Sequence, residues 1–133
     1  MTHSSKVSIS QTVPLFTVVD MAKSVAFYVD GLGFEMRHKW VKDGELRWCW
    51  LQRDDSALML EKFQGESPAN LSGGFTLYFI CDDAKAAHRE FKARGIQVGE
   101  PFVGNNMDVF YFKDPDGYRL SFESPIDRQN DDL

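Results

Sequence analysis

The sequence predicts an α+β domain made of two βαβββ modules. The strongest sign is an internal repeat: residues of the first half recur in the second half at a constant offset of 62 positions, as Asp20 and Asp82 do (82 − 20 = 62). The same offset relates Ala22 and Ala84, Lys23 and Lys85, Gly33 and Gly95, Asp54 and Asp116, Leu58 and Leu120, and Glu61 and Glu123. Turn-forming residues separate the predicted strands and helices of both halves in the same order. We therefore expect one layout repeated twice, with a cleft where the modules meet.

The first module starts with a β-rich strand at 13–19, in which Pro14 stands near the start, where strands tolerate proline. Asp20 is expected to cap the following helix, and Gly31 and Gly33 to end it. The apolar positions of this helix recur at helical spacing and are Ala22, Val25, Val29 and Leu32. Three strands follow, at 34–41, 46–52 and 57–63, with turns at 42–44 and 53–55 between them.

The second module repeats this order after a linker of turn-forming residues. A strand at 75–81 precedes an Asp82-Asp83 cap and a helix over 84–94, which Gly95 closes. Three more strands are expected near 96–98, at 108–113 and at 118–123, the last two joined by the turn Asp114-Pro115-Asp116-Gly117. The expected organisation is a single domain with a first module at about 12–63, a linker at 64–73, a second module at about 74–125 and a polar tail at 126–133.

The composition is that of one globular domain, with 133 residues, of which 43% are hydrophobic and 26% are charged. The net charge of −5 argues against a nucleic-acid partner, because a phosphate backbone is not attracted to an acidic protein. No apolar run is long enough to cross a bilayer, and the N-terminus lacks the apolar stretch of a secretory signal. With two isolated cysteines, Cys49 and Cys81, the expected location is the reducing cytoplasm.

Three motifs follow one another along the chain. They are Val13-Pro14-Leu15-Phe16-Thr17, then Ser24-Val25-Ala26-Phe27-Tyr28 with Leu32-Gly33-Phe34, then Phe112-Lys113-Asp114-Pro115-Asp116-Gly117-Tyr118 with Phe122-Glu123. In this order the motifs resemble the vicinal oxygen chelate superfamily, which includes glyoxalase I, extradiol dioxygenases, and fosfomycin and bleomycin resistance proteins. The resemblance covers about residues 12–125. It implies two βαβββ modules whose sheets curl around a cleft.

The metalloenzymes of this superfamily hold a divalent cation with four His, Glu or Gln side chains, two from each module. Aligned on Asp20 and on the turn at 114–117, these positions fall on Val13, Met59, Phe75 and Ser121. A slip of one residue would put Thr76 in place of Phe75. Neither set suits such a metal, because valine and phenylalanine donate no lone pair and methionine and serine are poor ligands for it. The resemblance therefore implies a protein without the shared metal site, and no other cofactor is expected.

The resemblance is greatest with the bleomycin resistance branch, whose members bind ligands without a metal. Pro14 matches the proline at which the N-terminal strand of that branch is exchanged between subunits, so the resemblance implies a homodimer. Met107, Phe110 and the turn at 114–117 fit a pattern of the branch, but Asp108-Val109 replaces its usual Arg-Glu pair. This departure leaves bleomycin as one candidate ligand among several.

All three tryptophans, Trp40, Trp48 and Trp50, lie in one predicted hairpin of the first module. Trp48 and Trp50 share a strand face, because they are two residues apart. In the family that the sequence resembles, this hairpin flanks the cleft. The tryptophans are either an aromatic wall that stacks on a planar or sugar-bearing ligand, or ordinary packing in a core or dimer interface.

Glu61 and Glu123 end the last strands of the two modules, on the strand face of Met59 and Ser121. Carboxylates beside a cleft would attract a cationic ligand or, if they shared a proton, perform acid–base work, whereas carboxylates at solvated strand ends would do neither. The three histidines do not have metal-ligand spacing. His88 lies on the apolar stripe of the second helix and is expected to be a hydrogen-bonded core residue.

Two functions remain open. The favoured one is a metal-independent binding protein that sequesters an aromatic, neutral or cationic small molecule, such as an antibiotic, in a cleft. The alternative is an enzyme of this fold with a non-standard or absent metal site, for which no catalytic residue can be named. The expected ligand-binding residues are Trp40, Trp48, Trp50, Met59, Glu61, Phe75, Phe110, Ser121 and Glu123. The expected partners are this ligand and a second copy of the chain, and neither nucleic acid nor a membrane.

Overall fold

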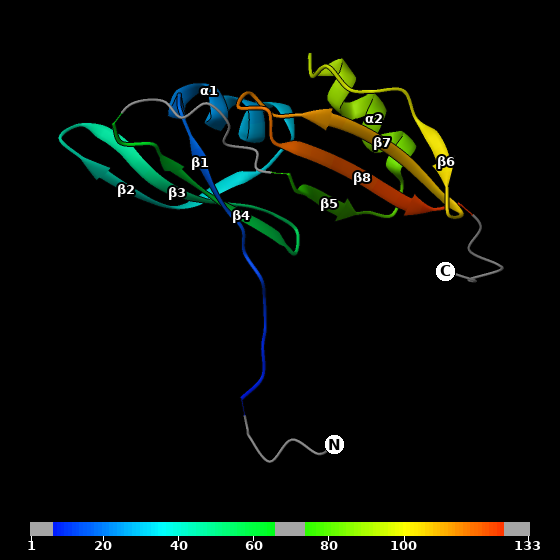
Figure 1. Cartoon of the computed structure of the whole chain (residues 1–133), viewed down its shortest axis with the longest axis horizontal. Helices are drawn as coiled ribbons and strands as arrows, with labels where there is room; N and C mark the ends of the chain where they lie inside the picture. The colour runs from blue at the N-terminus through cyan, green and yellow to red at the C-terminus, as the bar shows by residue number, and fades with distance from the viewer. Residues whose placement is uncertain (1–6, 66–73, 127–133) are drawn as a thin grey trace.

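The computed structural model describes residues 7–65 and 74–126 and contains two four-stranded sheets, one from each half of the chain (Figure 1). The predicted α+β class and its two similar modules are confirmed. Most of the predicted linker at 64–73 and nearly all of the polar tail at 126–133 lie outside the described residues. Within the described residues, no helix is long and apolar enough to span a membrane.

The first sheet has the strand order β1-β4-β3-β2, and its outer strand β1 runs parallel to β4. Its strands are β1 (Leu15–Val18), β2 (Glu35–Lys42), β3 (Glu45–Arg53) and β4 (Ser56–Lys62). Both predicted turns are present, and each contains an aspartate in the left-handed region, Asp43 at φ 53° and Asp54 at φ 52°. Aspartate tolerates this conformation better than most residues, which explains the Asp-rich turn sequences.

The second sheet has the equivalent order β5-β8-β7-β6, with β5 parallel to β8. Its strands are β5 (Thr76–Ile80), β6 (Phe102–Gly104), β7 (Met107–Lys113) and β8 (Arg119–Pro125). The strand predicted near 96–98 is wrong, because this segment forms only one bridge, between Val98 and Phe112. Pro101 lacks the N–H that would continue the ladder, and regular pairing with β7 resumes only at β6.

A helix follows the first strand of each module, and both helices lie on the same side of the two sheets (Figure 1). The first is α1 (Met21–Val25), which continues as a π-helical turn, η1 (Ala26–Gly31), and the second is α2 (Ala84–Ala93). The predicted caps are present: the Asp20 carboxylate accepts a hydrogen bond from the Lys23 N–H at 3.1 Å, and Asp83 accepts one from Ala86 at 3.0 Å.

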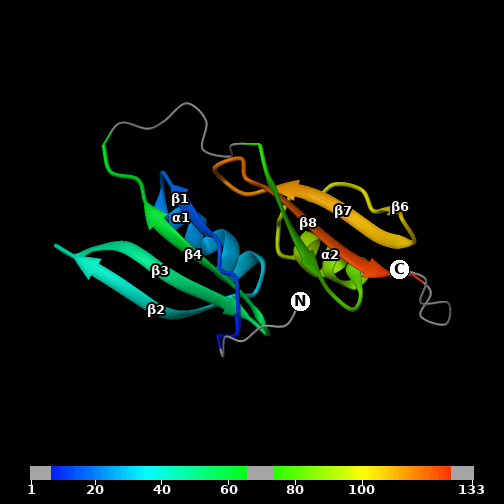
Figure 2. The same cartoon turned by 60° about the horizontal axis from the view of Figure 1, so that its bottom comes forward.

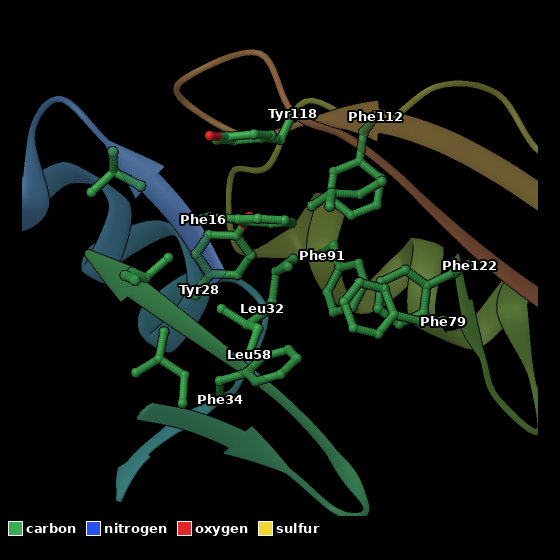
Figure 3. Close-up of a cluster of buried hydrophobic side chains, with 14 of the residues drawn as sticks. Phe16, Tyr28, Leu32, Phe34, Leu58, Phe79, Phe91, Phe112, Tyr118 and Phe122 are labelled. Carbon is green, nitrogen blue, oxygen red and sulfur yellow. The ribbon is translucent and has the colours of Figure 1, made fainter. Parts of the chain in front are cut away.

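The modules meet through aromatic side chains on the helix-facing sides of their sheets (Figure 3). The Phe16 ring of β1 stacks on Tyr118, with ring centroids 4.4 Å apart and planes at 7°. The hydroxyl of Tyr28 donates a hydrogen bond of 2.8 Å to the buried carboxylate of Asp114 across the same junction. Most of the junction is therefore a packed core where an open cleft was predicted. The faces that point away from the helices remain open.

Candidate functional site

The outer face of the first sheet carries the tryptophans, and we call it the tryptophan face. Its members are His38, Trp40, Trp48, Trp50, Met59 and Glu61. Cross-strand pairing places Trp40 beside Trp48, and Trp48 beside Glu61. Pairing also places His38 beside Trp50, and Trp50 beside Met59. The buried side chains of Cys49, Leu51, Leu58 and Leu60 alternate with these residues and point to the opposite side of the sheet.

The tryptophans differ in exposure and in how they are held. Trp40 is 54% exposed, whereas Trp48 and Trp50 are half-buried. The indole N–H of Trp50 donates a hydrogen bond of 3.0 Å to the Gln52 side chain, and the His38 ring meets the Trp50 ring edge-on at 6.1 Å. These contacts orient Trp50 and leave the tryptophan face a broad aromatic surface beside the carboxylate of Glu61.

The outer face of the second sheet, which we call the tyrosine face, consists of three cross-strand rows. The rows are Thr76, Arg119 and Lys113; Tyr78, Ser121 and Tyr111; and Ile80, Glu123 and Val109. The hydroxyls of Tyr78 and Tyr111 lie 3.2 Å apart in a hydrogen bond, and their rings meet edge-on at 6.2 Å. Hydrogen bonding to Tyr78 is the largest cause that raises the pKa of Tyr111, so this phenol stays protonated at neutral pH.

Ser121 lies in the middle of the tyrosine face, yet its side chain is fully buried. Its two cross-strand neighbours are Tyr78 and Tyr111, whose hydroxyls join beside it. The Ser121 Oγ has no hydrogen-bond partner among the described residues. A ligand thus meets the tyrosine pair before it meets Ser121.

The sequence did not single out the tyrosine pair or the two cations of the tyrosine face. Tyr78 and Tyr111 are 33 residues apart, so only strand pairing brings them together. The spacing of these residues within β7 and within β8 could nevertheless have indicated a shared face. Tyr111 and Lys113 are two residues apart, as are Arg119 and Ser121, and residues two apart share a strand face.

The first strands of the two modules do not follow the offset of 62 residues that relates their last strands. This difference in register corrects the prediction for Phe75. Leu15 pairs with Met59, whereas Tyr78 pairs with Ser121, so these strands are offset by 63 residues (78 − 15 = 63). Thr76 therefore corresponds to Val13, as the one-residue slip would require. The Phe75 ring instead lies 5.9 Å from that of Phe16 and 6.0 Å from that of Tyr118, at the module junction. One additional residue before β5 shifts the strand to the other face.

Phe110 also lies away from both outer faces. It is fully buried, its ring is stacked 5.8 Å from Phe122, and the His88 ring meets it edge-on at 5.1 Å. Because Val109 and Tyr111 point outward, their neighbour Phe110 must point to α2. His88 Nε2 lies 3.1 Å from the Gly99 carbonyl oxygen, so the residue is hydrogen-bonded as expected, but it is half-buried and lies outside the core in which it was predicted.

The four positions that correspond to the metal ligands of the superfamily carry Val13, Met59, Thr76 and Ser121. These side chains offer no imidazole and no carboxylate, which are the donors that Fe, Mn, Ni and Zn prefer. Elsewhere in residues 7–65 and 74–126, no group of three or more His, Cys, Asp or Glu side chains could hold a metal ion. The donor set therefore does not fit the metal of the superfamily.

The module junction contains a separate cavity of about 410 Å³ beside an ion pair. The Arg53 guanidinium donates to both Glu90 carboxylate oxygens, at 2.8 and 3.2 Å, and to the Leu32 carbonyl oxygen at 2.7 Å. The hydrogen bond from Arg53 is the largest cause that lowers the pKa of Glu90. Cys81 lines this cavity, but none of the predicted binding residues does. The cavity is lined by residues of both modules.

Comparisons with known proteins agree with this geometry. Residues 8–122 match the sequence profile of the Glyoxalase/Bleomycin resistance protein/Dioxygenase superfamily, and no curated protein sequence matches the chain. TnmS3, an antibiotic binding protein from Streptomyces sp. CB03234, superposes with a TM-score of 0.71 at 25% identity, over 90% of this chain and 98% of its own. A bleomycin-binding protein in complex with bleomycin has a TM-score of 0.70 at 26% identity, over 87% of this chain and 98% of its own.

A bleomycin resistance determinant encoded on transposon Tn5 has a TM-score of 0.72 at 25% identity, over 88% of this chain and 98% of its own. The resemblance inferred from the sequence motifs is thus confirmed by a profile match that spans nearly the whole chain and by solved structures of the bleomycin resistance type. The chain belongs to the glyoxalase/bleomycin resistance protein/dioxygenase superfamily.

Proposed function

We propose that this protein sequesters a planar aromatic small molecule, such as an antibiotic, against the outer faces of its sheets and without a metal ion. The observation that carries the proposal is the exposure of aromatic side chains on both faces: Trp40 is 54%, Tyr78 48% and Tyr111 42% exposed. Clusters of exposed apolar side chains on a folded protein mark interaction sites. Aromatic rings also provide stacking area at a small loss of conformational entropy.

The structural relatives support binding in preference to catalysis. TnmS3 is described as an antibiotic binding protein, and a second relative was solved with bleomycin bound. The alternative enzyme function is not favoured, because the four positions of the superfamily metal site carry no imidazole or carboxylate. We place the protein in the cytoplasm, where the free thiols of Cys49 and Cys81 would persist.

We further propose a homodimer in which the tryptophan face of one copy opposes the tyrosine face of the other. Residues 7–14 extend away from the body of the chain in Figure 1 and point toward the viewer in Figure 2. This arm carries Ile9, which is 88% exposed, and it joins the sheet at Pro14, whose carbonyl oxygen accepts a hydrogen bond from Met59 at 2.8 Å. An exposed apolar arm at a sheet edge fits strand exchange with a second copy.

In this dimer the tryptophan face and the tyrosine face would border a cleft. Within this cleft, Glu61 and Glu123 are proposed to set the preference for a neutral or cationic region of the ligand. Glu61 stands beside Trp48 on the tryptophan face, and Glu123 stands on the tyrosine face between Ile80 and Val109, two residues beyond Ser121. A carboxylate beside an aromatic wall attracts a cationic substituent and repels an anionic one. The proposed binding residues are therefore the members of the two faces, without Phe75 and Phe110.

Titration of tryptophan fluorescence against glycopeptide and planar aromatic antibiotics tests the proposal. The variants Trp48→Ala and Trp50→Ala are expected to weaken binding about tenfold or more, because each removes a stacking surface. Glu61→Gln is expected to weaken the binding of cationic ligands alone. Unchanged affinity in all three variants would remove the tryptophan face from the site. Steady turnover of lactoylglutathione, catechol or fosfomycin would favour the enzyme function instead.

A further inference from the structure

One end of the tyrosine face is hollowed into a cavity of about 520 Å³. The residues that line it are Thr76, Tyr78, Tyr111, Phe112, Lys113 and Arg119. This volume lies in the range of small-molecule sites, about 300–1,000 Å³. Because the cavity opens on the tyrosine face, a ligand subsite here rests on the proposed binding function and narrows the class of ligand.

The cavity places two cations side by side. Lys113 of β7 and Arg119 of β8 are direct cross-strand partners, and both side chains are exposed. Neither forms an ion pair within residues 7–65 and 74–126. Like charges directly opposite one another destabilise a sheet. An anion bound between the two side chains would remove this repulsion.

The tyrosine pair adds a hydrogen-bond donor next to these cations. Two phenol hydroxyls carry two hydrogens, and the hydrogen bond between Tyr78 and Tyr111 uses only one of them. The second hydrogen is left to donate to an acceptor on a ligand. Ser121 pairs with both tyrosines across the strands, and its buried Oγ has no hydrogen-bond partner in the described part of the chain. An acidic group at the cavity would thus meet two cations and a neutral donor.

Charge is separated along the tyrosine face. Glu123 lies four residues beyond Arg119 on β8, which corresponds to about 13 Å along an extended strand. At this distance, solvent and salt largely screen the carboxylate from the Lys113 and Arg119 pair. Thr76, the other partner of Arg119, is uncharged. The face therefore has a cationic end and an acidic end, with the tyrosine pair between them.

We propose that Lys113 and Arg119, together with the Tyr78–Tyr111 hydroxyl pair, bind an acidic substituent, such as a carboxylate, on the aromatic ligand of the cleft. Arginine suits this role because its planar guanidinium forms two parallel hydrogen bonds to a carboxylate. The ligand would lie with its ring system over the tyrosines and its acidic group at the Arg119 end. Any basic group would lie toward Glu123.

Calorimetric titration with three probes of matched shape tests the subsite: 2-naphthoate, 2-naphthamide and 2-naphthylmethylammonium. We expect naphthoate to bind about tenfold more tightly than naphthamide, as an additional charge-assisted hydrogen bond would give. Lys113→Gln and Arg119→Gln should each remove most of this difference, because each should weaken the binding of naphthoate far more than that of naphthamide. Lys85→Gln, at an exposed lysine of α2, is the matched control and should change neither affinity.

Arg119→Lys separates charge from geometry. It keeps the positive charge but loses the planar fork, so naphthoate should bind with an affinity between those of the wild type and Arg119→Gln. Equal affinity of the wild type for naphthoate and naphthamide would overturn the subsite, as would unchanged naphthoate binding in both glutamine variants. In either case binding of naphthamide would leave the proposed function intact. Failure of all three probes to bind would count against the cleft itself, and the subsite with it.

Discussion

Single side chains hold the two modules together, and Arg53 is the clearest example. Its guanidinium, on β3, binds the Glu90 carboxylate on α2 and the Leu32 carbonyl oxygen after η1. On the α2 side, Arg94 also donates to Glu90, at 2.7 Å, and to the Gly31 carbonyl oxygen, at 3.3 Å. Glu90 therefore bridges two arginines that each reach the end of the first helix. The negative charge of Glu90 is therefore expected to stabilise the contact between the modules.

Glu90→Gln tests this contact through its pH dependence. Because Arg53 lowers the folded-state pKa of Glu90, the carboxylate contributes stability above the pKa of an unfolded glutamate, about 4.3. That contribution is lost as the pH falls through the lower folded-state pKa. We expect the variant to lower the free energy of unfolding by about 1 kcal/mol at pH 7, since the pair is partly exposed, and by less in acid. Urea unfolding from pH 7 to pH 3 measures this.

The matched control for that experiment is Glu100→Gln, at an exposed glutamate for which no ion pair is found within residues 7–65 and 74–126. It should leave the free energy of unfolding nearly unchanged at every pH. A difference between wild type and Glu90→Gln that stayed constant down to pH 3 would show that the carboxylate charge does not stabilise the junction.

At the scale of elements, the position of β7 depends on the segment before β6 that runs antiparallel beside it and forms the bridge between Val98 and Phe112. Gly99 N–H donates a hydrogen bond of 2.8 Å to the Tyr111 carbonyl oxygen. A Cβ atom at Gly99 would lie 2.7 Å from that same oxygen, which is closer than atoms can pack. The close approach explains why a glycine stands here, next to the backbone of Tyr111.

Gly99→Ala should therefore displace this segment, lower the free energy of unfolding by about 1–3 kcal/mol and weaken ligand binding at Tyr111. Gly104→Ala is a fitting control, because a Cβ there would meet only the Phe102 ring, at 3.5 Å, which is ordinary contact. Thermal unfolding and ligand titration of both variants measure the two effects. Equal stability of the two variants would contradict the proposed close packing.

The sequence predicted the elements well where local pattern and tertiary packing agree. The Asp20 and Asp83 caps and the Asp-rich turns depend on nearby residues only, so sequence reasoning found them. The constant offset also located the last strands, because Met59 and Ser121 do occupy equivalent places. It failed at the first strands, where one additional residue changes the phase and hence the face of Phe75.

The candidate site could be predicted only in part, because strand pairing between distant segments builds it. The spacing of Trp48 and Trp50 showed one shared face, since both lie on a single strand. The tyrosine face depends instead on the register of three strands, which no local pattern specifies. The prediction for Phe110 came from a family pattern, which did not record the side of the sheet to which the residue points.

For the whole molecule, the aromatic outer faces and the projecting arm lead us to expect a dimer. Light scattering at micromolar concentration should give about twice the mass of the 15.2 kDa chain. Deletion of residues 2–11 should shift the equilibrium toward monomer, because it removes the exposed apolar side chains of Val7 and Ile9 from the arm. The folded core should remain, since β1 begins only at Leu15. A monomer mass for the intact chain would contradict the proposed pairing of faces.

Binding of the ligand by the outer faces of the sheets can be followed residue by residue in a two-dimensional ¹H–¹⁵N NMR titration with a planar aromatic antibiotic. The three tryptophan indole N–H signals and the amides of Tyr78 and Tyr111 report on the two faces. The amides of Cys81 and Glu90 report on the cavity at the module junction. We predict saturable shifts of the Trp48, Trp50, Tyr78 and Tyr111 signals while those of Cys81 and Glu90 stay in place. Shifts confined to Cys81, Glu90 and their neighbours would instead place the ligand at the module junction and contradict binding by the outer faces.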